Sequence, residues 1–410
     1  MRKHLKRAIA FGFAVTVVAA ACSGTSTSGT SGGPTKTVKI VSSLPMTGPS
    51  RTQTLTVVNG IKMAIEDAGK IGNVTVEFEA LDDATAAKQS WDAAQEAENA
   101  RKAIDDKKIV AYIGTYNSGA AKVSIPLLCK AGLVMVSPAN TYVGLTKSIP
   151  PISASNEPGT YYPDGCTHNF VRVVPNDKIQ GDADAQWAKE LGAKKIYILH
   201  DDELYGKGLA DGFRIKAKEL GIAEAGYEAA PKADNYRALV NKIKDSGADF
   251  VYHGSIVDNN SAIFLKNLRE VDPQGAIKFM TGDGNLCTEF AKGAGSAFEG
   301  AYGTFGGQAP EAYTGKAKDW LTKYKAKYGG DPDVYAIYGY EAASVVLAAL
   351  KAAGDKADDR ATVLKNVVAT KDFDGVLGKW SFDKDGDTSL TAVSAFIGKG
   401  GKWVFNKELR

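Results

Sequence analysis

Short apolar runs rich in Val and Ile alternate regularly with longer amphipathic segments from Thr37 onward. VKIVSSLP precedes NGIKMAIEDAGK, and VTVEFEALDD precedes an Ala-, Glu- and Lys-rich stretch from Ala86 to Asp106. IVAYIGTY then precedes SGAAKVSIPLLCKAG, and LVMVSPANT follows. Runs of this composition are typical of buried parallel strands, and segments with a period of 3.6 residues are typical of the helices that cover them. The alternation therefore predicts an α/β fold with a doubly wound sheet.

The alternation starts again after a long Pro/Gly-rich stretch, VGLTKSIPPISASNEPGTYYPDG, which we expect to be a packed surface loop. FVRVVPND, KIYILHDD, FVYHGS and IKFMTGDG have the composition of strands, and a further strand is expected near AGYEA. The segments between them predict helices over Gln180–Leu191, Gly206–Leu220, Asp234–Ser246 and Asn259–Glu270. The sequence therefore predicts a second α/β unit.

The C-terminal third has a different pattern. Helices are predicted between Glu311 and Thr370, and strand-like pieces return in DFDGVLGKWSFDKDGDTS, AVSAFIG and KWVFN. If each unit takes elements from both ends of the chain, the backbone must cross between the units more than once. Multiple crossovers would form a hinge rather than a loose linker.

The first 36 residues have the pattern of an export signal followed by a tether. Residues 1–21, MRKHLKRAIAFGFAVTVVAAA, combine a basic start, an apolar centre and small residues, as a signal peptide does. The alternative is an uncleaved N-terminal anchor. Residues 22–36 contain almost nothing that could be buried, which predicts a flexible tether.

Cys22 lies between the apolar run and the tether. Ala19-Ala20-Ala21-Cys22 resembles a bacterial lipobox, in which the cysteine is acylated, although Ala19 stands where Leu is usual. The alternative is a cysteine that merely follows a signal peptide. We expect Cys22 to be lipidated and to hold an exported protein on the outer face of the cytoplasmic membrane, because each buried methylene adds about 0.8 kcal/mol.

The charge of the chain does not indicate nucleic acid as a partner. The signal peptide carries four of the 50 Lys and Arg residues and no acids, so the mature chain has 46 basic against 47 acidic residues. A near-neutral chain with scattered charges lacks the basic surface that phosphate backbones require.

Catalytic and metal-binding motifs are missing from the sequence. There is no HExxH, no GxSxG and no GxxxxGK[ST]. Cys129, Cys166 and Cys287 lack CxxC spacing, so they predict no metal site. DKDGD from Asp383 lacks Gly at the sixth and Glu at the twelfth position of a calcium loop, and a polar turn is expected instead. We therefore expect neither catalytic activity nor a bound cofactor or metal. The alternative function, from a different class of protein, is that of an exported hydrolase.

Small polar and aromatic residues follow the predicted strands. GTYNSG and SPANT do so in the first unit, and HDDELYG and TGDG do so in the second. Ligands of doubly wound sheets bind beyond the carboxyl ends of the strands. A helix predicted to begin at Ser118 would suit a carboxylate, and Asp283 between two glycines would balance an ammonium. Each residue alone could be only a cap or a turn; together they predict a cleft for a small zwitterion.

The motifs IGTYNSGAAKVSIPLLCKAGLVMVSPANT, FVRVVPNDKIQG, ILHDDELYGKGLADGF and FDGVLGKWSFDKDGD resemble the periplasmic binding proteins of the leucine/isoleucine/valine class. These are extracytoplasmic receptors of ABC importers, and the similarity runs from about Val38 to the C-terminus. The resemblance implies two Rossmann-like lobes joined by a three-crossover hinge, the type I periplasmic binding protein fold. The first lobe would be residues 37–176 plus 306–392, and the second 177–305 plus 393–410.

The resemblance also implies a role for each site residue. Ser118 and Thr141 should hold the ligand carboxylate with backbone at Ala139 and Asn140, and Thr141 and Asp283 should hold the ammonium. Tyr205 should cover the ligand from the second lobe, and Tyr116 and Tyr335 should face its side chain. Asp177 lies at a crossover and would contribute at the cleft edge. Three features depart from the family: Tyr116-Asn117 is more polar than an aliphatic wall, Ile256 replaces a common aromatic, and GPSRTQ brings Arg51 and Gln53 towards the cleft mouth.

The same motif order places Cys129 and Cys166 in one lobe, so we expect a disulfide between them and a free thiol at Cys287. The function implied is capture of an amino acid, branched-chain or related, and its delivery by a monomer to ABC permease subunits. The rival within this fold is a sensor that binds amides or other small polar solutes.

Overall fold

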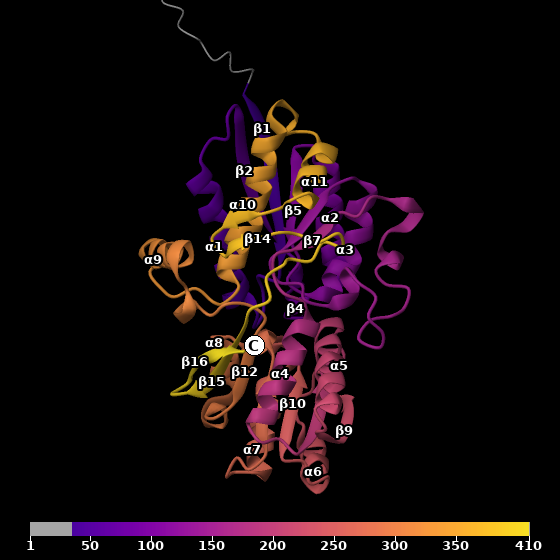
Figure 1. Ribbon diagram of the computed structural model, residues 1–410, viewed down its shortest axis with the longest axis vertical. Helices are drawn as coiled ribbons and strands as arrows, with labels where there is room; N and C mark the ends of the chain where they lie inside the picture. Colours follow the sequence, from indigo (N-terminus) through magenta and orange to yellow (C-terminus); the bar gives the residue numbers. More distant parts are fainter. Residues whose placement is uncertain (1–34, 410) are drawn as a thin grey trace, which may run out of the picture.

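The computed structural model describes residues 35–409, which form two α/β lobes, one above the other in Figure 1. The first lobe contains a five-stranded parallel sheet with the order β2-β1-β5-β6-β7. Its strands are β1 (Lys36–Leu44), β2 (Val74–Asp82), β5 (Ile109–Gly114), β6 (Val134–Ser137) and β7 (Phe170–Arg172). Every residue of β5, IVAYIG, is buried, as expected for a central strand covered on both faces.

Six helices belong to the first lobe: α1 (Arg51–Ala68), α2 (Ala93–Asp105), α3 (Ser118–Lys130), α9 (Gly315–Tyr328), α10 (Ala336–Ala353) and α11 (Arg360–Val368). The apolar helix α10 packs along α1 and contributes much of the core of this lobe. With the turn that follows, α10 is long and apolar enough to cross a membrane by composition alone, but two thirds of that stretch is buried in the lobe.

The second lobe contains a seven-stranded sheet with the order β16-β15-β12-β11-β10-β8-β9. Its strands are β8 (Lys195–His200), β9 (Ala223–Ala229), β10 (Phe250–Gly254), β11 (Lys278–Thr281), β12 (Tyr302–Phe305), β15 (Val393–Lys399) and β16 (Lys402–Leu409). The helices are α4 (Asp177–Glu190), α5 (Leu204–Glu219), α6 (Arg237–Asp245), α7 (Ser261–Val271) and α8 (Thr288–Ala294). The strands from β8 to β12 are parallel, and β15 and β16 add an antiparallel edge.

The chain passes between the two sheets three times: between β7 and α4, between β12 and α9, and before β15. In Figure 1 the C-terminal strands β15 and β16 therefore lie beside β12 in the lower lobe, although α9, α10 and α11 lie in the upper one. The predicted α/β fold, with two doubly wound units of the type I arrangement, is confirmed.

Two short hairpins and eight single turns complete the described chain. The hairpins are β3 (Ala84–Thr85) with β4 (Ser90–Trp91), and β13 (Phe373–Gly375) with β14 (Gly378–Trp380). The 3-10 turns are Val143–Leu145, Gly159–Tyr161, Pro163–Gly165, Val257–Asn259, Asp283–Asn285, Gly295–Phe298, Pro310–Ala312 and Gly354–Lys356.

Several helix boundaries differ from the prediction by two residues or more, and α2 and α6 are examples. The helical stretch expected from Ala86 begins only at Ala93, because the β3–β4 hairpin occupies its start and the Asp92 carboxylate accepts from the N–H groups of Ala94 and Gln95. The helix expected from Asp234 begins at Arg237. The prediction for the first segment ignored Asp92, whose side chain caps α2 inside a polar run, whereas the start of α6 has no side-chain cap.

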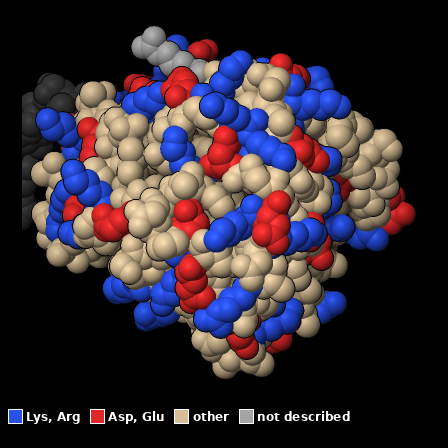
Figure 2. Space-filling model, turned by 90° about the horizontal axis from the view of Figure 1, so that it is seen from below, with Lys and Arg blue, Asp and Glu red and all other residues tan. Residues whose placement is uncertain are grey.

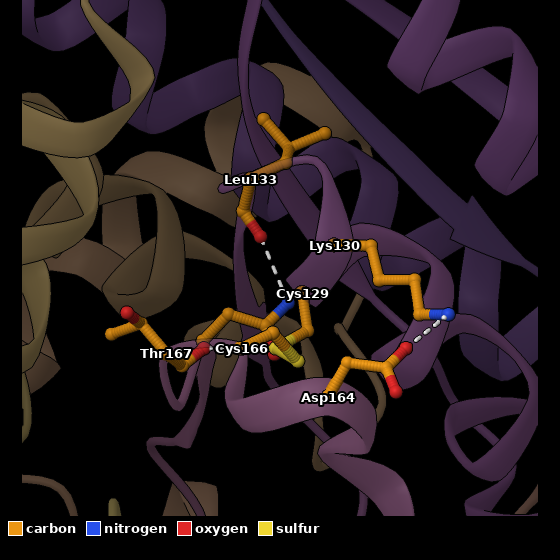
Figure 3. Close-up of a disulfide and its surroundings, with 7 residues drawn as sticks. Cys129, Lys130, Leu133, Asp164, Cys166 and Thr167 are labelled. Atoms are coloured by element: carbon orange, nitrogen blue, oxygen red, sulfur yellow. Dashed lines mark hydrogen bonds and ion pairs between the residues drawn. A yellow bond between two sulfur atoms is a disulfide. The ribbon is translucent and has the colours of Figure 1, made fainter.

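The long loop of the first lobe is tied down at several points. Cys129 at the end of α3 forms a disulfide with Cys166 in the loop, and Lys130 Nζ lies 3.0 Å from an oxygen of Asp164 beside it (Figure 3). Cys287 is free and buried. The Glu157 carboxylate accepts hydrogen bonds from the hydroxyls of Tyr142 and Tyr161. The loop is therefore a packed part of the lobe, as expected.

The surface at the second-lobe end carries charges of both signs. Figure 2 shows Lys and Arg interspersed with Asp and Glu over this face. Several of these charges form ion pairs, such as Arg237 with Glu270 and Lys242 with Glu228. This face therefore presents no broad basic patch.

Candidate functional site

A small cavity lies between the lobes at the carboxyl ends of their strands. It is lined by Tyr116, Asn117, Ser118, Ala139 and Tyr335 from the first lobe and by Tyr205, Ile256, Asp283 and Gly284 from the second. The cavity has a volume of about 20 Å³, which is room for one water molecule. The lobes are therefore closed on each other in this structure.

A larger hollow of about 730 Å³ lies between α8, β16 and the segment before α10. It is lined by surface groups such as Lys292, Lys325 and Trp403. We place the site in the smaller cavity because ligands of open α/β sheets bind beyond the carboxyl ends of the strands, where the smaller cavity lies.

The first-lobe wall is built on the N-terminus of α3, a helix of 13 residues. Ser118 is its first residue and is buried, and its hydroxyl accepts a hydrogen bond from the Tyr142 N–H at 3.3 Å. The first N–H groups of a helix have no partner within the helix and carry its positive end. This wall can therefore bind an anionic group such as a carboxylate.

The loop after β6 forms the rest of that wall. The Asn140 side chain donates to the Tyr116 carbonyl at 2.9 Å, and the Asn140 backbone N–H donates to Ser137 Oγ at 2.8 Å. Asn140 therefore holds the ends of β5 and β6 together. Ala139 lines the cavity, whereas Asn140 and Thr141 are buried behind it. The Thr141 hydroxyl makes no hydrogen bond to the described residues, but Thr141 does not line the cavity.

The second-lobe wall centres on Asp283, which directly follows β11 and a glycine. One carboxylate oxygen accepts from the Tyr205 hydroxyl at 3.0 Å, and the other accepts from the Tyr335 hydroxyl of the first lobe. Tyr205 in turn accepts from the Gly284 N–H at 3.2 Å. Burial raises the pKa of Asp283, and the hydrogen bond from Tyr335 offsets part of this rise.

The glycines beside Asp283 allow the backbone to lie close to its neighbours. A Cβ at Gly284 would be 2.8 Å from the Ser255 carbonyl oxygen, and one at Gly282 would be 2.4 Å from Leu209. Any larger residue would push the Asp283 turn away from β10 and α5. The local sequence TGDG therefore fixes the carboxylate at the cavity.

Tyr116 and Tyr335 meet at the remaining side of the cavity, where their rings lie edge to face with centroids 5.7 Å apart. The Tyr116 hydroxyl bonds to Gln53 Oε1, and Gln53 is fully buried. Arg51 is exposed, so only one of the two residues expected near the cleft mouth lies inside the protein. Ile256 lines the cavity, as its position after β10 suggests.

Asp177 is placed more deeply than the sequence indicated. We expected it at the cleft edge, but it is fully buried at the start of α4, and neither carboxylate oxygen makes a hydrogen bond to the described residues. Its N–H donates to the Thr141 carbonyl at 2.8 Å. Burial raises the pKa of Asp177 well above its usual value. The sequence signal was weak, because Asn-Asp before a helix is also an ordinary capping pattern.

Direct contacts between the lobes lie beside the cavity. The Asp258 carboxylate of the second lobe accepts from the N–H and the hydroxyl of Ser50, each at 2.9 Å, and from Ser90 Oγ at 3.2 Å. Thr52 also bonds to Glu289. These contacts use the segment GPSRTQ, which was expected near the cleft mouth, and the β3–β4 hairpin, to which no sequence motif pointed.

Comparisons with known proteins identify the family of this chain. The family model described as "Periplasmic binding protein" matches residues 37–399. A Leu/Ile/Val-binding protein homolog of Brucella abortus is 30% identical over 353 residues, covering 85% of this chain and 86% of the relative. An amino acid binding protein of Pseudomonas aeruginosa is 29% identical, covering 81% and 82%. The crystal structure of a leucine binding protein from Thermotoga maritima matches with a TM-score of 0.78 at 27% identity, covering 91% of this chain and 99% of the other. The chain therefore belongs to the periplasmic binding protein family.

Proposed function

We propose that this protein is an extracytoplasmic receptor that captures an amino acid between its two lobes and delivers it to an ABC importer. The observation that carries the proposal is the pairing across one cavity of an anion-binding helix end at Ser118 with a buried carboxylate at Asp283. A zwitterion with a carboxylate and an ammonium is the complement of these two walls. Relatives named for Leu, Ile and Val binding support the same class of ligand.

In this account the ligand carboxylate binds the N-terminus of α3 with Ser118, Thr141 and backbone of Ala139 and Asn140. The ammonium binds Asp283 and Thr141 and takes the place of the tyrosine hydroxyls that bond to Asp283 without ligand. Tyr205 covers the ligand from the second lobe. Asp177 lies next to Thr141, and its N–H donates to the Thr141 carbonyl, which positions Thr141 at the ammonium end.

Capture would proceed by closure of residues 37–176 plus 306–392 on residues 177–305 plus 393–410. The walls of the cavity come from both lobes, so only the closed state can offer all of the contacts to one ligand. A ligand shifts such an equilibrium by the difference in its affinity for the two states.

Cys22 lies outside the described residues, as do the signal peptide and most of the tether. We propose that Cys22 is lipidated after cleavage and that residues 22–36 tether a monomer beside its permease, which raises its effective concentration there. Cys22→Ser should move the protein from the membrane fraction to the soluble fraction. A variant that stays fully membrane-bound would contradict lipid anchoring.

Thermal unfolding in the presence of each common amino acid tests the proposed ligand class. A ligand at 100 times its dissociation constant should add about 2.7 kcal/mol of stability. 4-Hydroxybenzoate is a useful control, because it has a carboxylate but no ammonium to pair with Asp283. Stabilisation by 4-hydroxybenzoate and by no amino acid would refute the proposal, as would turnover of any ligand.

A further inference from the structure

The N-terminus of α1 in the first lobe is bonded to a carboxylate of the second lobe. Ser50 is the residue before α1, and its own side chain makes no capping bond to the helix. Asp258, in the turn after β10, accepts from the N–H and the hydroxyl of Ser50, each at 2.9 Å. Both residues are buried. Aspartate is a common capping residue, but it normally directly precedes the helix that it caps.

The charge of the second lobe complements this end of α1. The first turn of α1 contains no acidic residue, although a negative charge is favourable near the N-terminus of a helix. The second lobe supplies Asp258 and also Glu289 of α8, which accepts from the Thr52 hydroxyl. The start of α1 therefore has these two carboxylate partners only when the lobes are together.

The β3–β4 hairpin of the first lobe adds to the same contact. Ser90 Oγ donates to the Asp258 carboxylate at 3.2 Å. The hairpin packs against the segment before α1, since a Cβ at Gly48 would lie 2.1 Å from the carbonyl oxygen of Gln89. Burial raises the pKa of Asp258, and the hydrogen bonds from Ser50 and Ser90 offset part of this rise. Asp258 is thus held by two segments of the first lobe that lie against each other.

These polar groups lie beside the cavity and do not line it. Ile256 lines the cavity, whereas Asp258, two residues later, and Ser50 do not. A captured amino acid therefore does not compete for them. The side chains of Asp258 and Ser50 can rotate, so the contact can follow the lobes into a closed state wide enough for the amino acid.

We propose that Asp258 is a latch that sets how slowly a captured amino acid is released, by bonding the second lobe to the start of α1 after closure. The inference rests on the proposed function, because it assumes that an amino acid is captured between the lobes. Asp258 is a positioning residue: it holds the lobes together and does not touch the ligand. Capture itself is governed by the cavity, and the lifetime of the complex is governed by the latch.

Asp258→Asn tests the latch, because asparagine keeps the shape of the side chain and removes its charge. The probe is the amino acid that most stabilises the wild type against heat, starting with leucine. In stopped-flow measurements the variant should release this amino acid about tenfold faster, as expected when a hydrogen bond to a charged group is lost. The association rate should not change, because the contact forms only after the amino acid has entered. Asp234→Asn, in an exposed loop of the same lobe, is the matched control and should release at the wild-type rate.

Ser50→Ala tests the contact from the other lobe. Its effect should not add to that of Asp258→Asn, so the double variant should release the amino acid at the rate of Asp258→Asn alone, within about twofold. Effects that multiply would show that the two residues act separately, each through its own lobe, and would overturn the inference. If Asp258→Asn does not fold, Ser50→Ala combined with Ser90→Ala should speed release with the second lobe intact.

The outcomes separate the latch from the proposed function. An unchanged or slower release from Asp258→Asn, with an amino acid that binds the wild type, would overturn the latch and leave amino-acid capture standing. Slower release would show in addition that the contact belongs to a closed state that excludes the amino acid. If no amino acid binds the wild type, the proposed function fails and the latch fails with it.

Discussion

At the residue scale, Asp283 has the clearest chemical role. It is a carboxylate removed from water, and the hydroxyls of Tyr205 and Tyr335 donate to its two oxygens. A buried charge of this kind needs a partner of opposite charge to be favourable. A ligand ammonium would supply that partner, which is why we expect the acid to contribute more to binding than to folding.

Asp283→Asn should therefore weaken amino-acid binding strongly. The loss should be several kcal/mol, about 2–5, because the ammonium would be left buried and unpaired. Asp385→Asn, in the turn after β14, is the matched control and should bind as the wild type does. Equal affinities of the two variants in calorimetry would remove Asp283 from the site.

The residues named from the sequence gather at one cavity or directly behind it, because strand ends of parallel sheets converge. The hydrogen bond between Gln53 and Tyr116 could not be predicted, since it joins α1 to the loop after β5 through side chains far apart in sequence. The burial of Asp177 could not be predicted from the sequence either, because it depends on how closely α5 packs against the start of α4. The sequence pattern thus predicted residues that the fold brings together at or behind one cavity, whereas their hydrogen-bond partners could be identified only from the fold.

At the scale of elements, α4 stands out because it carries two fully buried carboxyl groups, Asp177 and Asp184. Asp184 accepts from the Tyr252 hydroxyl at 2.6 Å, and burial raises its pKa to about 8. These two buried side chains stabilise the fold most when their carboxyl groups are protonated. Its contribution to stability should therefore depend on pH.

Between the unfolded pKa of about 4 and the folded pKa of about 8, the native Asp184 holds a proton that the unfolded chain has lost. Its contribution to stability is complete below pH 4 and falls by up to about 1.4 kcal/mol per pH unit as the pH rises to 8. Asp184→Asn should remove this term and flatten the pH dependence of the unfolding free energy. Asp182→Asn, on the exposed side of the same helix and paired with Lys178, is the control. Parallel curves for wild type and Asp184→Asn from pH 5 to 8 would contradict this reading.

The disulfide between α3 and the long loop closes a segment with a separation of 37 residues. Its removal by Cys166→Ala should cost roughly 3–4 kcal/mol by the chain-entropy estimate. Thiol labelling of the non-reduced, denatured protein without its N-terminal 36 residues should detect Cys287 alone, and the buried Cys287 should react slowly before denaturation. Labelling at Cys129 or Cys166 without reductant would show that the bond does not form.

The order of strands and helices could be predicted from the alternating pattern, but the start of α2 could not. The polar run from Ala86 to Asp92 has a helical composition, yet pairing of Ala84 with Trp91 holds it as a hairpin. That hairpin brings Ser90 to Asp258 of the other lobe. A tertiary contact overrides local propensity here, as is common in short polar segments.

At the scale of the whole molecule, the two large sheets are separate, and three segments of the described chain connect the lobes that contain them. Hydrogen bonds from Ser50 and Ser90 to Asp258 and from Tyr335 to Asp283 join the lobes directly. Thr52 also bonds to Glu289, and Leu204 packs against the apolar core of the first lobe. A ligand that contacts both lobes can shift the balance between open and closed states by the difference in its affinity for them. The closed state that binds a ligand must be wider than this arrangement, whose cavity has room for one water.

Small-angle scattering with and without an amino acid whose binding has been established by calorimetry tests the central claim most directly. The radius of gyration of the wild type should decrease when the ligand is added, because the lobes rotate together around it. Tyr205→Ala should fold but compact less at matched saturation, since a buried aromatic contact from the second lobe is lost. A wild type whose radius does not change with a ligand proven to bind would contradict capture by closure of the two lobes.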